Sequence, residues 1–147
     1  MDERLAEHLR LLGKYLDYLD GFALKPMDEF LKDITLRGAA ERYLQLAIES
    51  CLNIGNRVLS LTYNDADLGA PENYADIFIK LGKLGIFTQE FVLNLVNMAR
   101  FRNKLVHAYW EIEPERIYDI LQNNVKDIHE FKQRIIGFLN ANEIEKG

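Results

Sequence analysis

Apolar side chains recur along this chain at alternating intervals of four and three residues, and this spacing limits the folds that it can adopt. The rhythm places side chains on one stripe of an α-helix, whereas a strand alternates its faces every second residue. Because such stripes pack against one another in bundles, we predict an all-α fold, an antiparallel up-and-down helical bundle. The three clearest series are Leu5, Leu9, Leu12, Leu16 and Leu19; Leu44, Ala47, Cys51, Ile54, Val58 and Leu61; and Ile117, Leu121, Ile128, Phe131, Ile135 and Phe138.

Prolines and a glycine pair indicate where the helices begin and end. Pro26, Pro71 and Pro114 each stand just before an acidic residue, a combination that suits the first turn of a helix. The pair Gly82 and Gly85 predicts a helix end, and the next helix has a suitable N-cap in Thr88. We expect a loop over residues 63–72 and helices near 2–20, 27–34, 36–62, 73–84, 88–104 and 114–140.

Composition narrows the class of protein. The 147 residues carry 18 Lys and Arg against 23 Asp and Glu, a net charge of −5, so the chain is not the polycation typical of bulk nucleic-acid binding. Its single cysteine excludes an internal disulfide, and no apolar run approaches the length of a membrane span. We expect a cytoplasmic protein with no membrane segment, no metal site and no cofactor. It has one helical domain over residues 1–140 and a polar tail over 141–147.

A stripe of polar residues runs along the expected helix 36–62. Two interpretations of this stripe stay open: a face exposed to solvent, or one wall of a polar cleft between subunits. Arg42 and Glu49 are seven residues apart, too far for a local ion pair, so any partners come from other elements. Cys51 lies on the apolar stripe of the same helix, and we expect a small core residue there rather than a nucleophile. The polar stripe comprises Arg42, Gln45, Glu49, Asn53, Asn56 and Ser60.

The segment 99–110 is the one clearly basic stretch of an acidic chain. It contains Arg100, Arg102 and Lys104, with no acidic residue between Glu90 and Glu111. Arg102 takes the slot that follows Phe91, Leu95 and Met98 on the apolar stripe, where an isolated buried charge is costly. Its guanidinium is therefore expected to reach the surface, or to point into a polar cavity or an interface.

His107 follows Arg102 by five residues, which a continuous helix would place on a different face, roughly 140° around its axis. If the two cooperate, the helix must end or kink between them. A histidine can accept or donate a proton at a ribose hydroxyl or a leaving oxygen, and an arginine can stabilise a charged phosphoryl group. Asn103 and Tyr109 are placed to orient a phosphate. These residues are the minimum set for RNA cleavage without a metal, and a symmetric dimer would bring together the two histidines that serve as acid and base. The plainer alternative is a basic helix end capped by a histidine.

The run Arg102-Asn103-Lys104-Leu105-Val106-His107-Ala108-Tyr109 resembles the Arg-x4-6-His signature of HEPN domains, in the Arg-x4-His-x-Tyr form of the HepT-like toxins. Residues 37–49 are similar to that family's long second helix, and residues 71–78 to its loop and short helix before the motif. The chain departs from the family at Asn53-Ile54-Gly55, where an acidic-aliphatic-alanine run is more usual.

The resemblance implies a homodimer whose two motifs share one cleft, and a ribonuclease toxin encoded beside a minimal nucleotidyltransferase (MNT) antitoxin. It makes Arg102 and His107 catalytic, Asn103 a supporting polar residue and Tyr109 the acceptor of AMP from the antitoxin. Positive charge for binding RNA would come from Arg100, Lys104 and Arg42. The alternative is a non-catalytic subunit that binds a nucleotide or a partner for a nucleotidyltransferase.

Overall fold

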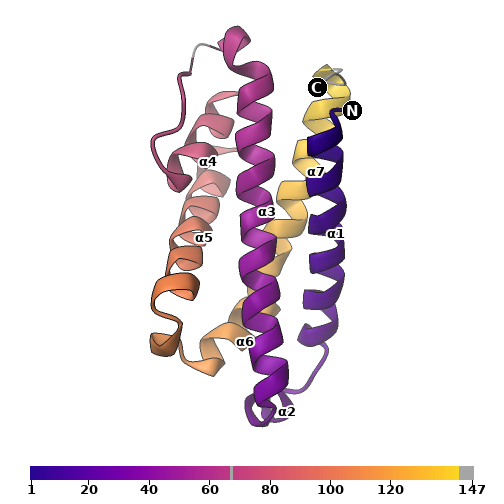
Figure 1. The fold of residues 1–147 in the computed structure, drawn as a ribbon, viewed down its shortest axis with the longest axis vertical. Coiled ribbons are helices and arrows are strands. Elements are labelled where there is room, and N and C mark those ends of the chain that lie inside the picture. The colour runs from indigo at the N-terminus through magenta and orange to yellow at the C-terminus, as the bar shows by residue number, and fades with distance from the viewer. Residues whose placement is uncertain (67, 143–147) are drawn as a thin grey trace.

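The computed structural model describes residues 1–66 and 68–142, and within these ranges the chain is a bundle of helices without strands. In Figure 1 the long helix α3 runs through the middle, with α4 and α5 on one side and α1 and α7 on the other. None of the helices in the described ranges is both long and apolar enough to cross a membrane. The elements are α1 (Glu3–Ala23), α2 (Met27–Lys32), α3 (Ile34–Ala66), α4 (Tyr74–Lys83), α5 (Gln89–His107), the 3₁₀ turn η1 (Tyr109–Glu111), α6 (Pro114–Asn123) and α7 (Val125–Asn142).

The predicted apolar series form the core of the bundle. Every leucine of the first series is buried, and so are the members of the other two series except Leu61 and Phe138, which are partly buried. Phe78 of α4 packs edge-on against Phe131 of α7, with ring centroids 5.8 Å apart. Cys51 is fully buried, and burial raises the pKa of its thiol, so the expectation of a core cysteine is confirmed. The all-α prediction is confirmed as well.

Three helix starts follow the predicted signals, whereas α4 begins at Tyr74 with Asn73 as its N-cap, two residues beyond Pro71. Pro26 precedes α2 and Pro114 opens α6, while the side chain of Thr88 caps α5 by accepting from the Phe91 amide at 3.2 Å. The C-terminal end of α4 follows the glycine signal. Gly85, two residues after the helix, adopts a φ of +85°, a left-handed conformation that glycine takes without strain and that ends the helix.

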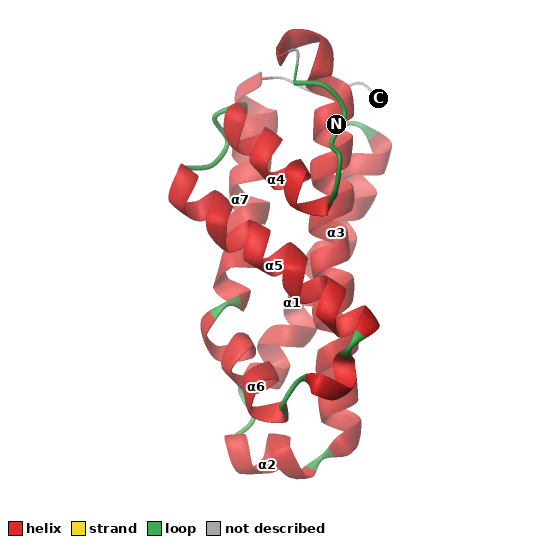
Figure 2. Ribbon diagram, turned by 90° about the vertical axis from the view of Figure 1, so that its left-hand side faces the viewer, coloured by secondary structure: helices red, strands yellow, loops and turns green. Residues whose placement is uncertain are grey.

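The expected single helix 114–140 is wrong, because the chain turns at Asn124 and forms α6 and α7 instead. Asn124 occupies a slot of the apolar series, and its amide stays exposed rather than entering the core. The turn lets α6 cross the end of the bundle beside α2, as Figure 2 shows. There the Tyr118 hydroxyl and the Gln122 amide donate to the Lys25 and Ala23 carbonyls, each at 2.7 Å.

Further boundaries differ from the expectation, and α1 continues to Ala23 rather than ending near residue 20. α3 continues through residues 63–66 of the predicted loop, and α5 continues to His107 rather than ending near residue 104. α7 extends to Asn142, which takes in residues 141–142 of the predicted tail. Asp67 and residues 143–147 lie outside the described residues. α3 runs on because the sequence has no proline or glycine between residue 63 and Gly69 that would stop it. α5 runs on because Leu105, near its end, is buried.

Candidate functional site

α5 divides the basic segment between two environments. Ala99 and Leu105 are buried on the face that packs into the bundle, and Arg102 lies partly buried on the same side. The opposite, exposed side carries Arg100, Asn103, Lys104 and His107. The helix therefore turns its arginine inward and its histidine outward.

Arg102 is held by a carboxylate from α3. Its Nη2 and Nε both donate to Glu49 Oε2, at 2.8 and 3.0 Å, and only 16% of the Arg102 side chain and 28% of the Glu49 side chain are exposed. The ring of Tyr74, at the start of α4, lies over the guanidinium with its centroid 5.1 Å from Cζ. Asn103 Oδ1 accepts a longer bond from Nη1 at 3.4 Å. The expected polar environment for Arg102 is thus provided by its own chain.

His107 is the last residue of α5 and is exposed. The helix reaches it without interruption, so the kink that would bring it to Arg102 within one chain does not occur. The β-branched Val106 lowers helix propensity by only tenths of a kcal/mol, roughly, and burial of the neighbouring Leu105 outweighs this. Among the described residues, no hydrogen bond joins the Arg102 and His107 side chains.

Tyr109 and Trp110 project from η1 just beyond the helix. The backbone leaves the α-helix at Ala108, and Ile112 is buried after the turn, which anchors η1 against the bundle. The Tyr109 side chain is 57% exposed and that of Trp110 is 70% exposed, with the two rings edge-on at 5.6 Å. The phenol therefore stands within reach of another molecule.

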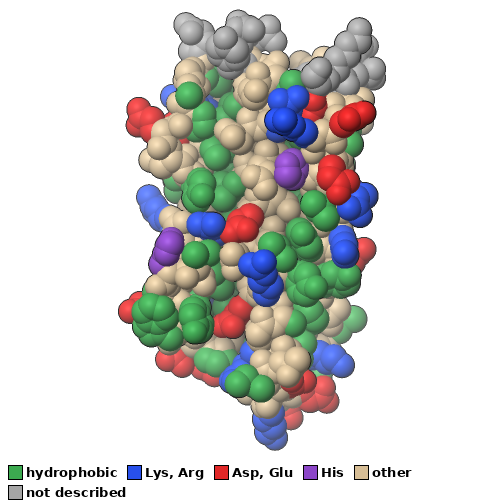
Figure 3. Space-filling model, viewed as in Figure 1, with side chains coloured by type: hydrophobic (Ala, Val, Ile, Leu, Met, Phe, Trp, Pro, Cys, Tyr) green, Lys and Arg blue, Asp and Glu red, His purple; other side chains and the backbone are tan. Residues whose placement is uncertain are grey.

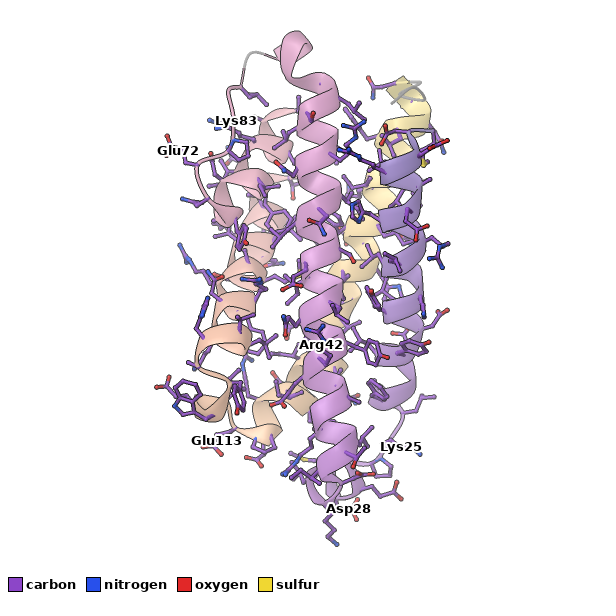
Figure 4. All side chains as sticks on the ribbon, viewed as in Figure 1. Lys25, Asp28, Arg42, Glu72, Lys83 and Glu113 are labelled. Atoms are coloured by element: carbon purple, nitrogen blue, oxygen red, sulfur yellow. The ribbon has the colours of Figure 1, made fainter. Side chains whose placement is uncertain are left out.

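Part of the polar stripe of α3 is exposed to solvent, as the first interpretation expected, and part of it contacts α5 of the same chain. Arg42, labelled in Figure 4, and Asn53 are exposed, as a solvent-facing stripe requires. Glu49 instead reaches across to α5, and Gln45 Nε2 donates to the same Glu49 oxygen at 3.0 Å. The partner of Glu49 does come from another element, as its spacing from Arg42 predicted. The sequence pattern did not predict that Glu49 pairs with Arg102. Two features pointed toward it: an acidic residue in the polar stripe of α3, and an arginine at a position of α5 where the pattern favours an apolar residue.

Apart from the residues of the motif, the surface has a groove between α5 and the α6–α7 turn. The groove is polar and is lined by Asn94 and Asn97 of α5, Arg116 of α6, Asn124 between α6 and α7, and Asp127 of α7. Burial raises the pKa of the Asp127 carboxyl. No sequence pattern predicted this groove, because its residues converge only where the chain turns between α6 and α7.

Charge on the surface agrees with the net acidity of the chain. On the face seen in Figure 3, Lys and Arg side chains are interspersed with Asp and Glu rather than gathered into one basic patch. In residues 1–66 and 68–142, no group of three or more His, Cys, Asp or Glu side chains is arranged to hold a metal ion.

A helical bundle that carries Arg-x4-His-x-Tyr at the C-terminal end of one of its helices, here α5, defines the HEPN class of proteins. Comparison with family models narrows this class further, because the model described as "Ribonuclease HepT-like" matches residues 7–135. The chain belongs to the HepT-like ribonuclease family.

Characterised relatives agree with that assignment. The chain is 32% identical over 112 residues to the tRNA nuclease HepT of Aphanizomenon flos-aquae, covering 75% of this chain and 72% of the relative. It is 29% identical over 103 residues to the mRNA nuclease HepT of Shewanella oneidensis, covering 70% and 74%. The fold matches that of the tri-AMPylated Shewanella oneidensis HEPN toxin solved in complex with its MNT antitoxin. The TM-score is 0.81 at 23% identity, covering 93% of this chain and 99% of that one.

Proposed function

We propose that the chain is the ribonuclease toxin of a HepT/MNT toxin–antitoxin pair, and that it cleaves RNA without a metal ion through Arg102 and His107. One observation carries the proposal: α5 presents an arginine held in a polar contact and an exposed histidine in the family's spacing. The two HepT relatives, one named a tRNA nuclease and the other an mRNA nuclease, support the reaction class.

The reaction uses the 2′-hydroxyl next to the scissile phosphate as the nucleophile. His107 takes the proton of that hydroxyl, the 2′-oxygen attacks phosphorus, and the bond from phosphorus to the 5′-oxygen breaks. A second histidine gives a proton to the departing 5′-oxygen, which leaves a 2′,3′-cyclic phosphate and a 5′-hydroxyl. Arg102 stabilises the extra negative charge on the phosphoryl oxygens, and Asn103 orients the phosphate.

A homodimer supplies what one chain lacks. Each chain carries one histidine in the motif, and α5 directs it away from its own Arg102. In a two-fold dimer the same patch of both chains meets at the axis, so a shared cleft contains two arginines and two histidines. Arg100, Lys104 and Arg42 are exposed cations that we assign to binding the RNA backbone.

The antitoxin acts on Tyr109. The phenol of Tyr109 is exposed on η1, two residues after the proposed catalytic His107. An AMP group attached to it adds bulk and negative charge where RNA binds. A tri-AMPylated HEPN toxin from Shewanella oneidensis, solved with its MNT antitoxin, supports this mode of control.

Cleavage of RNA in the presence of EDTA tests the proposal. We expect a 2′,3′-cyclic phosphate product, and a rate that falls about 100-fold or more in Arg102→Ala and in His107→Ala. His129→Ala is the matched control, because His129 is bonded to Asp20 at 3.0 Å on the α1–α7 side. Undiminished cleavage by both motif variants would overturn the assignment. Binding of RNA or nucleotide without cleavage, and harmless expression without the antitoxin, would favour the non-catalytic subunit.

A further inference from the structure

The contacts around the Arg102 guanidinium go beyond what the motif specifies. Two of its N–H groups, on Nε and Nη2, donate to the same oxygen of Glu49, at 3.0 and 2.8 Å. Gln45, one turn before Glu49 on α3, donates to that oxygen as well at 3.0 Å. The ring of Tyr74 covers the guanidinium, 5.1 Å from centroid to Cζ. Residues of α3 and α4 thus fix the position of a charged side chain that α5 carries.

The donors that remain define an edge of the guanidinium. Arginine has five N–H groups in a planar fork, and Glu49 uses one on Nε and one on Nη2. The contact from Nη1 to Asn103 is long, 3.4 Å. The edge formed by Nη1 and Nη2 therefore keeps donors with the spacing that two oxygens of one phosphate accept.

We propose that Glu49 and Tyr74 are positioning residues for RNA cleavage, holding Arg102 so that its Nη1–Nη2 edge meets the scissile phosphate. This inference rests on the proposed function, since it requires that Arg102 contact the reacting phosphate. An unrestrained arginine samples many rotamers and must be ordered during the reaction, whereas one held in advance is ordered before RNA arrives. The residues act through Arg102 and do not touch the RNA.

The sign of the effect separates positioning from restraint. The negative charge of Glu49 also weakens the attraction of Arg102 for phosphate. If this were its only effect, Glu49 would reduce the cleavage rate of the wild-type protein. Glu49→Gln keeps the shape and removes the charge that orients two donors. For a positioning residue, kcat falls by about tenfold while KM changes little, because the lost interaction matters in the transition state. For a restraining residue, cleavage becomes faster.

Steady-state cleavage by the full-length protein tests this prediction. The variants are Glu49→Gln, Tyr74→Ala and Tyr74→Phe, where phenylalanine keeps the ring face over the guanidinium and is expected to restore turnover. Glu41→Gln is the matched control, since Glu41 is a half-buried carboxylate two turns earlier on α3 without a hydrogen bond to Arg102. Single-turnover rates for Glu49→Gln in the Arg102→Ala background complete the set. If Glu49 acts through Arg102, the second change lowers the residual rate no further.

A spectroscopic measurement keeps the test independent of activity. The ¹H–¹⁵Nε signal of Arg102, identified by its absence in Arg102→Ala, is expected to shift in Glu49→Gln and to stay in place in Glu41→Gln. Unchanged or faster cleavage by Glu49→Gln, or an unmoved Nε signal, overturns the positioning role. If Arg102→Ala itself cleaves like the wild type, the proposed function fails instead, so the two failures are distinguishable.

Discussion

Arg102 and His107 lie five residues apart on the uninterrupted helix α5, which places their side chains roughly 140° apart around its axis. Arg102 is turned toward α3, where Glu49 holds it, and His107 is exposed at the end of the helix. An active site that uses both side chains at one phosphate is therefore best built from two chains.

Mixing two inactive variants tests whether the site is shared. We expect Arg102→Ala and His107→Ala, each nearly inactive alone, to regain a small but measurable fraction of cleavage when co-expressed. The mixed dimer holds one intact arginine and one intact histidine, and water must replace the second histidine in one of the two proton transfers. Dimers carrying a different tag on each chain allow the mixed species to be purified and assayed for RNA cleavage. A mixed dimer as inactive as its parents would show that one arginine and one histidine from different chains do not make a working site.

Removal of the Tyr109 hydroxyl is expected to abolish modification and to spare cleavage. The phenol is 57% exposed and is not needed for the proton transfers, so Tyr109→Phe keeps the ring and loses only the acceptor oxygen. Intact mass after co-expression with the cognate nucleotidyltransferase measures the outcome, with AMP increments on the wild type and none on the variant. Tyr18→Phe is the control, because Tyr18 is also exposed but lies on α1. AMP increments on Tyr109→Phe would place the acceptor elsewhere.

Arg100 and Lys104 are expected to bind RNA through charge alone. Both are exposed on the side of α5 that carries His107. Each substitution by alanine is expected to raise KM with little change in kcat, and to reduce the slope of log K against log salt by roughly 0.7, the value for one contact to single-stranded RNA. Lys14→Ala on α1 is the control. A salt slope unchanged in both α5 variants would remove them from the RNA interface.

The fold was predictable because its main signal is local. A repeat of four and three residues marks the buried side of a helix wherever it occurs, and Leu5 through Leu19 are buried as that repeat requires. The helix boundary at Asn124 was not predictable in the same way. A single polar residue in an apolar series can face solvent on a continuous helix or mark a turn. Hydrogen bonds from α6 to the end of α1 and the turn after it, and the packing of Tyr118 on Phe30 of α2, decide between these outcomes.

The candidate site was predictable in composition and only partly in geometry. Arg102 in the slot of an apolar side chain indicated that a polar partner was needed, but Glu49 is 53 residues away in sequence. Only the packing of α3 against α5 brings the two together. Tyr74 shows the same limit, since its exposed ring had no local feature that indicated a cation above it.

Asp2 and Arg57 are expected to make the bundle sensitive to acid. Asp2 is 2% exposed, caps α1 at the Leu5 amide and forms an ion pair with Arg57, which lowers the pKa of its carboxyl from 3.8 to about 2. A lowered pKa stabilises the folded state fully above pH 3.8, and this contribution is lost as pH falls toward 2. Asp2→Asn keeps a capping side chain, so we expect a loss of about 1–2 kcal/mol at pH 6. At pH 2, where the folded-state carboxyl is about half protonated, we expect a loss of only a few tenths of a kcal/mol, roughly. Urea unfolding at the two pH values measures it, with Asp17→Asn as an exposed control on α1. An equal loss at both pH values would exclude the ion pair as the cause.

Gly55 of α3 is expected to be required for the close approach of α4. A Cβ atom there would lie 2.6 Å from Ile77 Cγ2 and 2.9 Å from Leu81 Cδ1, and both side chains are buried. Gly55→Ala gains helix propensity of about 1 kcal/mol but overpacks a fixed contact, so we expect a net loss of stability of about 1–2 kcal/mol. Gly38 lies on the same helix with nothing within 4 Å of a Cβ, so Gly38→Ala receives the propensity gain alone and is expected to stabilise the protein. Thermal unfolding of the two variants separates packing from propensity, and stabilisation by both would show that α4 yields to the added methyl group.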